Sequence, residues 1–119
     1  MASPDDLARI ALSLPGVVGE GVDFAIGRKA ICWTYLARAT PRGRREPVDG
    51  VVAIRCDLTA KEMLIATVPD RFFDDDHYRG YPAVLARLDA LDPSELAGLL
   101  QTAWSLQAPA RLKKTPREP

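Results

Sequence analysis

Apolar side chains recur at helical spacing near the start of the chain, directly after a capping sequence. Ser3 is followed by Pro4 and, three positions after Ser3, by Asp6. Such a serine and acid satisfy backbone N–H groups that the first helical turn leaves unpaired, and proline is favoured at the first helical position. The apolar residues after this start share one helical face: Leu7, Ile10, Ala11 and Leu14. The pattern predicts a helix that begins at Pro4 and ends before Pro15.

Two later helices are predicted from the same chemistry. Thr59 and Glu62 stand three positions apart, and Pro69 bounds the apolar run that follows them. Asp92 and Glu95 repeat the spacing before a longer apolar run. We therefore expect Thr59 to cap a short second helix and Asp92 to cap a third, because each side chain can accept a hydrogen bond from the first turn.

Runs of β-branched and aromatic residues predict strands between the helices. Residues 22–26 and 30–36 flank Gly27, which can supply the positive φ of a hairpin turn. Residues 40–50 contain two prolines and two glycines and have no apolar period. We expect them to form a long loop before a strand at residues 51–56.

Shorter apolar runs at residues 71–73 and 83–88 predict two further strands, separated by a turn-rich segment. Strands linked by short turns and loops favour an antiparallel sheet, with the helices covering one face. The expected fold class is α+β, with residues 1–112 as a single domain. Residues 113–119 carry no apolar side chain and are expected to form a flexible basic tail.

The composition is that of an ordinary globular protein. Of the 119 residues, 47% are hydrophobic and 27% are charged, which is too apolar for disorder and too charged for a membrane span. Residues 1–6 carry acids where a secretory signal needs positive charge. We expect a cytoplasmic monomer without membrane association. In that reducing compartment Cys32 and Cys56 should be free thiols that pack as small apolar side chains.

The chain does not contain the usual ligand spacings of a metal site. It has one histidine, His77, and its two cysteines are far apart in sequence. Three consecutive aspartates, at positions 74–76, precede His77 but lack the alternating spacing of a calcium loop. We interpret this segment as a solvated acidic turn whose carboxylates bond local backbone N–H groups.

Catalytic and phosphate-binding motifs are not recognised either. Gly16, Gly19 and Gly21 follow a predicted helix and match neither the Walker spacing nor a dinucleotide fingerprint, so we interpret them as a turn. The segments around Ser13 and Ser105 hold no nucleophile elbow. We therefore expect a protein that is not an enzyme and that has no cofactor.

Charge is unevenly distributed although the net charge is zero. Residues 24–55 hold seven bases and two acids, whereas residues 62–95 hold eight acids and three bases. If the two signs occupy different faces, a neutral protein can still bind a polyanion.

The basic stretch is the sequence's candidate binding site. Arginines on a flexible loop can follow a phosphate backbone, although surface arginines are often only solubilising. Trp33 and Tyr35 could stack on bases if they are exposed, or belong to the core, as we expect for Trp104. The candidate nucleic-acid-binding residues are Arg28, Lys29, Arg38, Arg42, Arg44, Arg45, Lys113 and Lys114.

Four segments, in order, also resemble a known family. They are ALSLPGV at residues 11–17, the segment 24–29, HYRGYPAVLARLD at residues 77–89 and the segment 95–112. Together they resemble the MmcQ/YjbR family of small bacterial proteins. The resemblance implies a CyaY-like α+β fold and the DNA-binding role with which that family is commonly labelled.

Two hypotheses for function follow. In the first, hairpin loops act as wings whose bases bind double-stranded DNA weakly and largely without sequence preference. In the second, the chain is an adaptor whose protein partner binds the acidic segment 70–76 or the aromatic turn 78–81.

Overall fold

The computed structural model describes residues 1–38, 40 and 42–113, and it places every strand within these residues in one antiparallel sheet. The strand order is β1-β2-β3-β4-β6-β5. The predicted α+β class with an antiparallel sheet is therefore confirmed. The elements in chain order are α1 (Pro4–Leu12), β1 (Val17–Glu20), β2 (Asp23–Ile26), β3 (Lys29–Arg38), β4 (Arg45–Arg55), α2 (Leu58–Thr67), β5 (Phe72–Phe73), β6 (Ala83–Arg87), the 3₁₀ turn η1 (Leu88–Ala90), α3 (Pro93–Gln107) and α4 (Ala110–Lys113).

Two of the three predicted helix starts are confirmed. The Ser3 hydroxyl accepts from the backbone N–H of Asp6 at 3.1 Å, and the Asp6 carboxylate accepts from the N–H of Ser3 at 3.0 Å. At α3 the Asp92 carboxylate accepts from the N–H of Glu95 at 2.7 Å, and the Glu95 carboxylate accepts from the N–H of Asp92 at 3.2 Å. Both helices therefore begin at the residues that their capping boxes predict.

The predicted cap of α2 is wrong. Asp57, and not Thr59, is the N-cap, and its carboxylate accepts from the N–H of Ala60 at 2.7 Å. The reason lies in the residue that follows β4, because the N–H of Cys56 still donates to the carbonyl of Pro82, directly before β6, at 3.1 Å. Asp57 is then the first residue free to turn, and α2 begins one residue later.

Replacing Asp57 with alanine should lower the free energy of unfolding by about 1 kcal/mol, the usual value of an N-cap bond. Thr59→Ala is the matched control, since it removes a hydroxyl from the same exposed turn and should change stability by less than about 0.5 kcal/mol. Urea unfolding of both variants measures the difference. Equal losses in the two variants would contradict the observed cap.

Strands β2 and β3 form the predicted hairpin, in which Gly27 adopts φ +60°. Strand β1 was not predicted, because Gly16, Gly19 and Gly21 together suggested only a turn. Gly19 lies inside β1, and a Cβ there would come within 2.0 Å of the carbonyl oxygen of Asp23. Because glycine has no Cβ, it allows β1 and β2 to pair this closely. The residue that suggested a turn is therefore part of a strand.

The predicted loop at residues 40–50 is also wrong in part. Residues 45–50 belong to β4, where Glu46 pairs with Ala37 and Pro47 with Leu36. The register shifts between Thr34 and Leu36, and Gly50 adopts φ +79°, which marks a bulge. The strand could not be recognised from the sequence, because a bulge interrupts the apolar alternation that identifies a strand.

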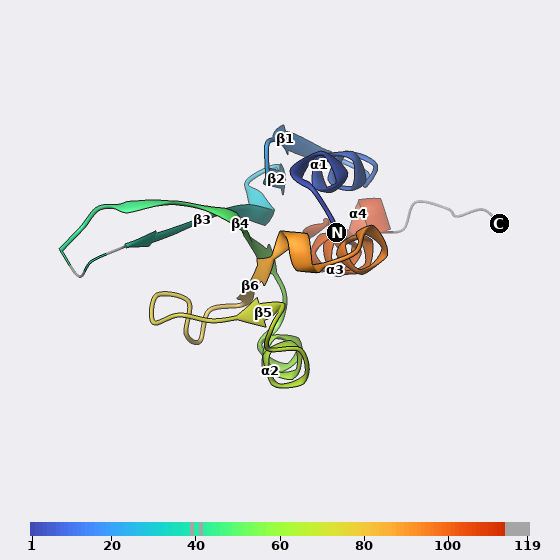
Figure 1. Cartoon of the computed structure of the whole chain (residues 1–119). Coiled ribbons are helices and arrows are strands. Elements are labelled where there is room, and N and C mark those ends of the chain that lie inside the picture. The colour runs from blue at the N-terminus through green and yellow to red at the C-terminus, as the bar shows by residue number, and fades with distance from the viewer. Residues whose placement is uncertain (39, 41, 114–119) are drawn as a thin grey trace.

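The far parts of β3 and β4 pair only with each other and extend beyond the rest of the sheet. Figure 1 shows them as a two-stranded projection on the left of the molecule. The next strands of the sheet reach only as far as Cys32 on β3 and Val51 on β4. We call residues 36–38, 40 and 42–48 the β3–β4 arm.

The two faces of the sheet carry different layers. Apolar side chains of α1, α2 and α3 pack with one face, which includes Val52, Ile54 and Val84. On the other face, Tyr35, Ala53 and Leu85 pack with Tyr78, which lies in the segment between β5 and β6. The helices thus cover one face, as predicted, and a loop covers the other.

The two cysteines are buried and free, as the sequence predicted. Burial raises the pKa of Cys32 to about 12 and that of Cys56 to about 11. Both thiols are therefore protonated at neutral pH, and thiols in this state are poor nucleophiles. No helix in the described part of the chain has both the length and the hydropathy that crossing a bilayer requires.

Candidate functional site

The β3–β4 arm carries four arginines at its tip. Arg38 ends β3, Arg42 and Arg44 lie between the strands, and Arg45 begins β4. The turn is closed by the N–H of Gly43, which donates to the carbonyl of Thr40 at 3.0 Å. Within the described residues, none of these arginines is in an ion pair. Their charge is thus available to an external anion.

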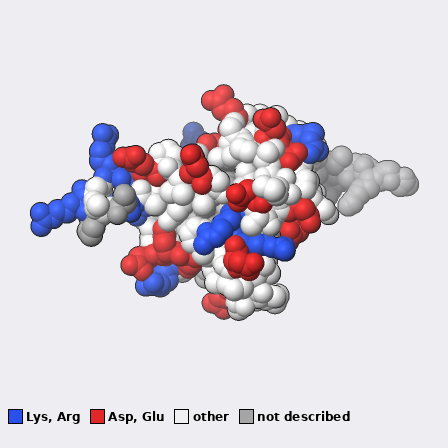
Figure 2. Space-filling view, viewed as in Figure 1, with Lys and Arg blue, Asp and Glu red and all other residues white. Residues whose placement is uncertain are grey.

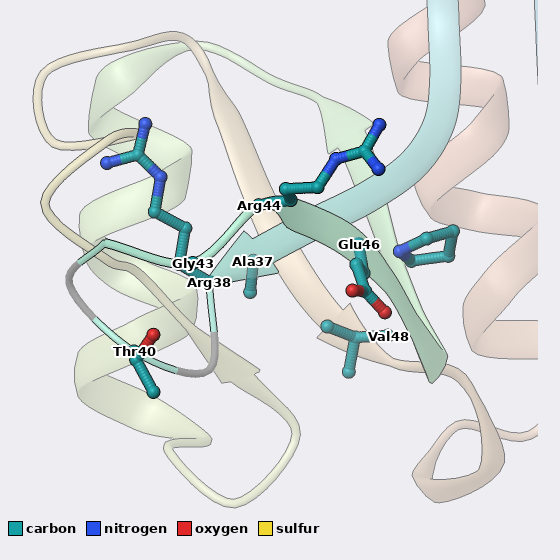
Figure 3. A pocket seen from close by; sticks show the side chains of 8 residues that line it. Ala37, Arg38, Thr40, Gly43, Arg44, Glu46 and Val48 are labelled. Atoms are coloured by element: carbon teal, nitrogen blue, oxygen red, sulfur yellow. The ribbon is translucent and has the colours of Figure 1, made fainter.

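The arm also contains a shallow hollow. Its volume is about 480 Å³, and its lining includes Arg38, Arg44 and Glu46. Figure 3 shows the side chains of Arg38 and Arg44 extending away from the arm, with their guanidinium groups well apart from each other. Arg45 is held more tightly, because its guanidinium donates to the carbonyl of Leu36 at 2.9 Å. The arm therefore presents spread cationic donors and not one converging anion pocket.

The other predicted contacts lie elsewhere. Arg28 precedes β3, Lys29 begins it and Arg38 ends it. The length of this ten-residue strand, about 30 Å, therefore separates Arg28 and Lys29 from the arginines of the arm. Arg28 and Lys29 instead line a hollow with Arg111, near the end of α3. The structure therefore does not bring the predicted bases onto one surface. The Lys113 side chain and Lys114 lie outside the described residues.

The acidic segment lies beside the arm and not on a distant face. Arg38 and Arg45 line a hollow of about 360 Å³ together with Asp75 and Asp76. In Figure 2 acidic and basic side chains alternate over the visible face. The condition under which the charge pattern would favour polyanion binding, that the two signs occupy different faces, is therefore not met around the arm. The cause is long-range strand pairing, which places β6 next to β4 and carries the acidic loop with it.

Tyr35 anchors the acidic segment. It is buried, so it is not an exposed stacking residue, and its hydroxyl donates to the Asp75 carboxylate at 2.5 Å. Burial, followed by the hydrogen bond to Asp75, raises the pKa of Tyr35 to about 12. The other oxygen of Asp75 accepts from the N–H of Tyr78 at 2.8 Å. This agrees with the interpretation of the segment as an acidic turn bonded to local backbone.

A second site, an aromatic pocket, was not identified from the sequence as a unit. Its volume is about 360 Å³. Trp33 and Tyr81 pack edge to face with ring centroids 6.4 Å apart, and Tyr78 and Tyr81 do so at 5.9 Å. The pocket is lined by Trp33, His77, Tyr78 and Tyr81. The only available signal was the clustering of aromatic residues at 77–81, since Trp33 joins them through the sheet.

Arg55 supports this pocket from β4. Its guanidinium carbon lies 5.2 Å from the ring centroids of both Trp33 and Tyr81, which is the geometry of a cation–π contact. Its Nη2 donates to the Tyr81 hydroxyl at 3.3 Å, while its buried Nε has no partner among the described residues. Arg55 is thus held chiefly by the two rings.

Lys61 fixes the segment that carries the pocket. Its side chain is only 3% exposed, although it belongs to the first turns of α2. The ammonium donates to the carbonyls of Tyr78 at 2.6 Å and Tyr81 at 3.0 Å, and it pairs with Asp74 at 3.1 Å. All three donors of the ammonium are therefore used within the chain.

The described residues contain no group of three or more His, Cys, Asp or Glu side chains arranged to hold a metal ion. The chemistry of the two sites is instead that of arginine donors on an arm and of aromatic rings beside it. The first can hold phosphate or carboxylate groups, and the second can hold a planar ring.

Comparison with known proteins shows close relatives. Uncharacterized protein Rv2570 of Mycobacterium tuberculosis strain H37Rv is 37% identical over 120 residues, which span 94% of this chain and 93% of the relative. Uncharacterized protein MT2646 of Mycobacterium tuberculosis strain CDC 1551 and Uncharacterized protein Mb2600 of Mycobacterium bovis match to the same extent. No family model matches the chain. No solved structure matches it.

Proposed function

The chain belongs to the family of these mycobacterial proteins, and on that premise we propose that it is a non-catalytic DNA-binding protein whose β3–β4 arm holds the phosphate backbone. The observation that carries the proposal is the arm itself, a projecting strand pair with four arginines at its tip. Within the described residues these arginines have no acidic partner in an ion pair.

The shape of the arm supports this assignment. The major groove of B-DNA is about 12 Å wide and admits a two-stranded β-ribbon. Exposed side chains of Arg38, Arg42 and Arg44 around such a ribbon can reach phosphates on either side of the groove. Contacts to phosphate position a protein but carry no sequence information, so the proposed binding is largely independent of sequence.

The MmcQ/YjbR resemblance supports the same proposal. We propose that this family of mycobacterial relatives falls within the MmcQ/YjbR group and shares its CyaY-like fold. The antiparallel sheet with helices on one face is compatible with that assignment. The arm would then act as the wing that the group's DNA-binding label implies.

The test is the salt dependence of binding to a fluorescently labelled DNA duplex. Four engaged phosphates give a slope of log affinity against log salt of about −4, and the dissociation constant near physiological salt should be on the order of 10⁻⁴ to 10⁻⁶ M. Fluorescence anisotropy at three or more salt concentrations gives both quantities. A protein that leaves the duplex free even at low salt would contradict the proposal.

A further inference from the structure

We propose that the aromatic pocket of Trp33, His77, Tyr78 and Tyr81 takes an unpaired nucleobase from a single strand whose phosphates lie on the β3–β4 arm. The chain would then prefer single-stranded DNA to duplex. This inference rests on the proposed function and specifies the form of the ligand.

The pocket already has the form of a stacking site. Its rings meet edge to face, as in the Trp33–Tyr81 pair at 81° and the Tyr78–Tyr81 pair at 74°. Tyr81 is 42% exposed and His77 is also exposed, so ring surface is available at the mouth. Every base has a π-face, so stacking on such rings tolerates any sequence.

The walls of the pocket are held in place without a ligand. The Trp33 indole N–H donates to the Tyr78 hydroxyl at 2.9 Å. The Lys61 ammonium donates hydrogen bonds to the backbone carbonyls of Tyr78 and Tyr81 and so fixes their positions. A site that is already ordered costs little conformational entropy when it binds, so even a single base can contribute measurably to affinity.

Charge selects a base over a cationic ligand. Aromatic cages that bind quaternary ammonium groups offer the open faces of their rings to the ligand cation. Here the guanidinium of Arg55 already lies over Trp33 and Tyr81. A second cation would meet a like charge, whereas a neutral base would not.

The pocket and the arm lie on one path along β3. Trp33, Tyr35 and Ala37 alternate along the strand and pack in one cluster on the same face. His77 lines both the aromatic pocket and the hollow that holds Arg38 and Arg45. Arg38 lies five positions after Trp33 on β3, a distance of about 16 Å that a few nucleotides of an extended strand can cover.

The aspartates between the two sites are already paired within the chain. Asp74 pairs with Lys61 at 3.1 Å, and Asp76 pairs with Arg79 at 2.6 Å. Asp75 accepts from the Tyr35 hydroxyl and the Tyr78 N–H. These contacts reduce the repulsion between the aspartates and a phosphate that lies between the two sites.

In a duplex, a base could enter the pocket only after it has been unpaired and unstacked, which is energetically unfavourable.

The experiment uses the emission of Trp33 in the Trp104→Phe background, because Trp104 is the other tryptophan of the chain and is buried. Three ligands are titrated at one salt concentration: an oligothymidylate of about 12 nucleotides, an abasic strand of the same length, and a duplex. We expect oligothymidylate to quench Trp33 and to bind about tenfold more tightly than the abasic strand, as one stacked base should provide.

Variants locate the effect. Tyr81→Ala should abolish the advantage of oligothymidylate over the abasic strand, and Tyr81→Phe should retain it because the ring remains. Leu106→Ala is the matched control, since it truncates a comparably exposed side chain on α3, on the other side of the sheet. Circular dichroism establishes that each variant is folded.

The outcomes separate the two proposals. Equal affinity for oligothymidylate and the abasic strand, with Trp33 unquenched and salt-dependent binding retained, would overturn this inference and leave the proposed function in place. Quenching of Trp33 by tetramethylammonium in place of oligothymidylate would assign the pocket to a cation and also overturn it. If no strand and no duplex binds at low salt, the proposed function fails and this inference fails with it.

Discussion

Replacing Lys61 with methionine should lower the free energy of unfolding by about 3 kcal/mol, because three buried or partly buried acceptors lose their common donor. The side chain is 3% exposed, and its ammonium reaches two backbone carbonyls and the Asp74 carboxylate. Methionine preserves most of the apolar volume, so the change reports the polar contacts and not a cavity. Urea unfolding followed by circular dichroism measures the loss.

Lys29→Met is the control for this prediction. Lys29 also carries one positive charge, but its side chain is exposed at the start of β3, so its replacement should change stability by less than about 0.5 kcal/mol. The Lys61 variant should also be cut faster by trypsin after Arg79, since that residue lies between the two carbonyls that Lys61 holds. Identical unfolding midpoints for the two variants would show that Lys61 is not the anchor of this segment.

Local signals predicted the elements that depend on neighbouring residues. The caps of α1 and α3 and the β2–β3 hairpin each depend on residues within a few positions of one another, and all three are confirmed. The cap of α2 was predicted at Thr59, whereas the residue that caps the helix is Asp57, two positions earlier. The position of the cap depends on where β4 ends, and that end is set by pairing with a strand almost thirty residues away.

Strands in which proline or glycine is accommodated only by pairing with another strand were missed or shortened. Proline and glycine in residues 45–50 suggested a loop, yet pairing with β3 stabilises these residues as a strand with a bulge. Gly19 in β1 likewise has its role only beside Asp23 of β2. Residue type alone cannot reveal this, because the same glycine that ends one strand permits the close approach of another.

The candidate site was predicted in its residues but not in its surroundings. Four of the predicted bases do lie at the tip of the β3–β4 arm, namely Arg38, Arg42, Arg44 and Arg45. Their separation from Arg28, their proximity to Asp75 and the pocket at Trp33 all result from the order of strands in the sheet. A count of charges along the sequence cannot reveal the order of strands in the sheet.

Replacing Arg42, Arg44 and Arg45 together with alanine should flatten the salt dependence of duplex binding by about two to three units, since each lost phosphate contact removes close to one unit of slope. Affinity at low salt should fall with it. The side chains of Arg42 and Arg44 are exposed, and the turn contributes no member to the core, so the fold should remain intact.

The matched control is the triple variant Arg28→Ala, Lys29→Ala and Arg111→Ala, which removes the same charge from the hollow at the far end of β3. Fluorescence anisotropy on one labelled duplex, at several salt concentrations, compares both triple variants with the unmodified chain. The arm variant should lose most of its slope while the far-end variant keeps a slope of about −4. Equal slopes for the two variants, or a greater loss in the far-end variant, would contradict binding by the β3–β4 arm.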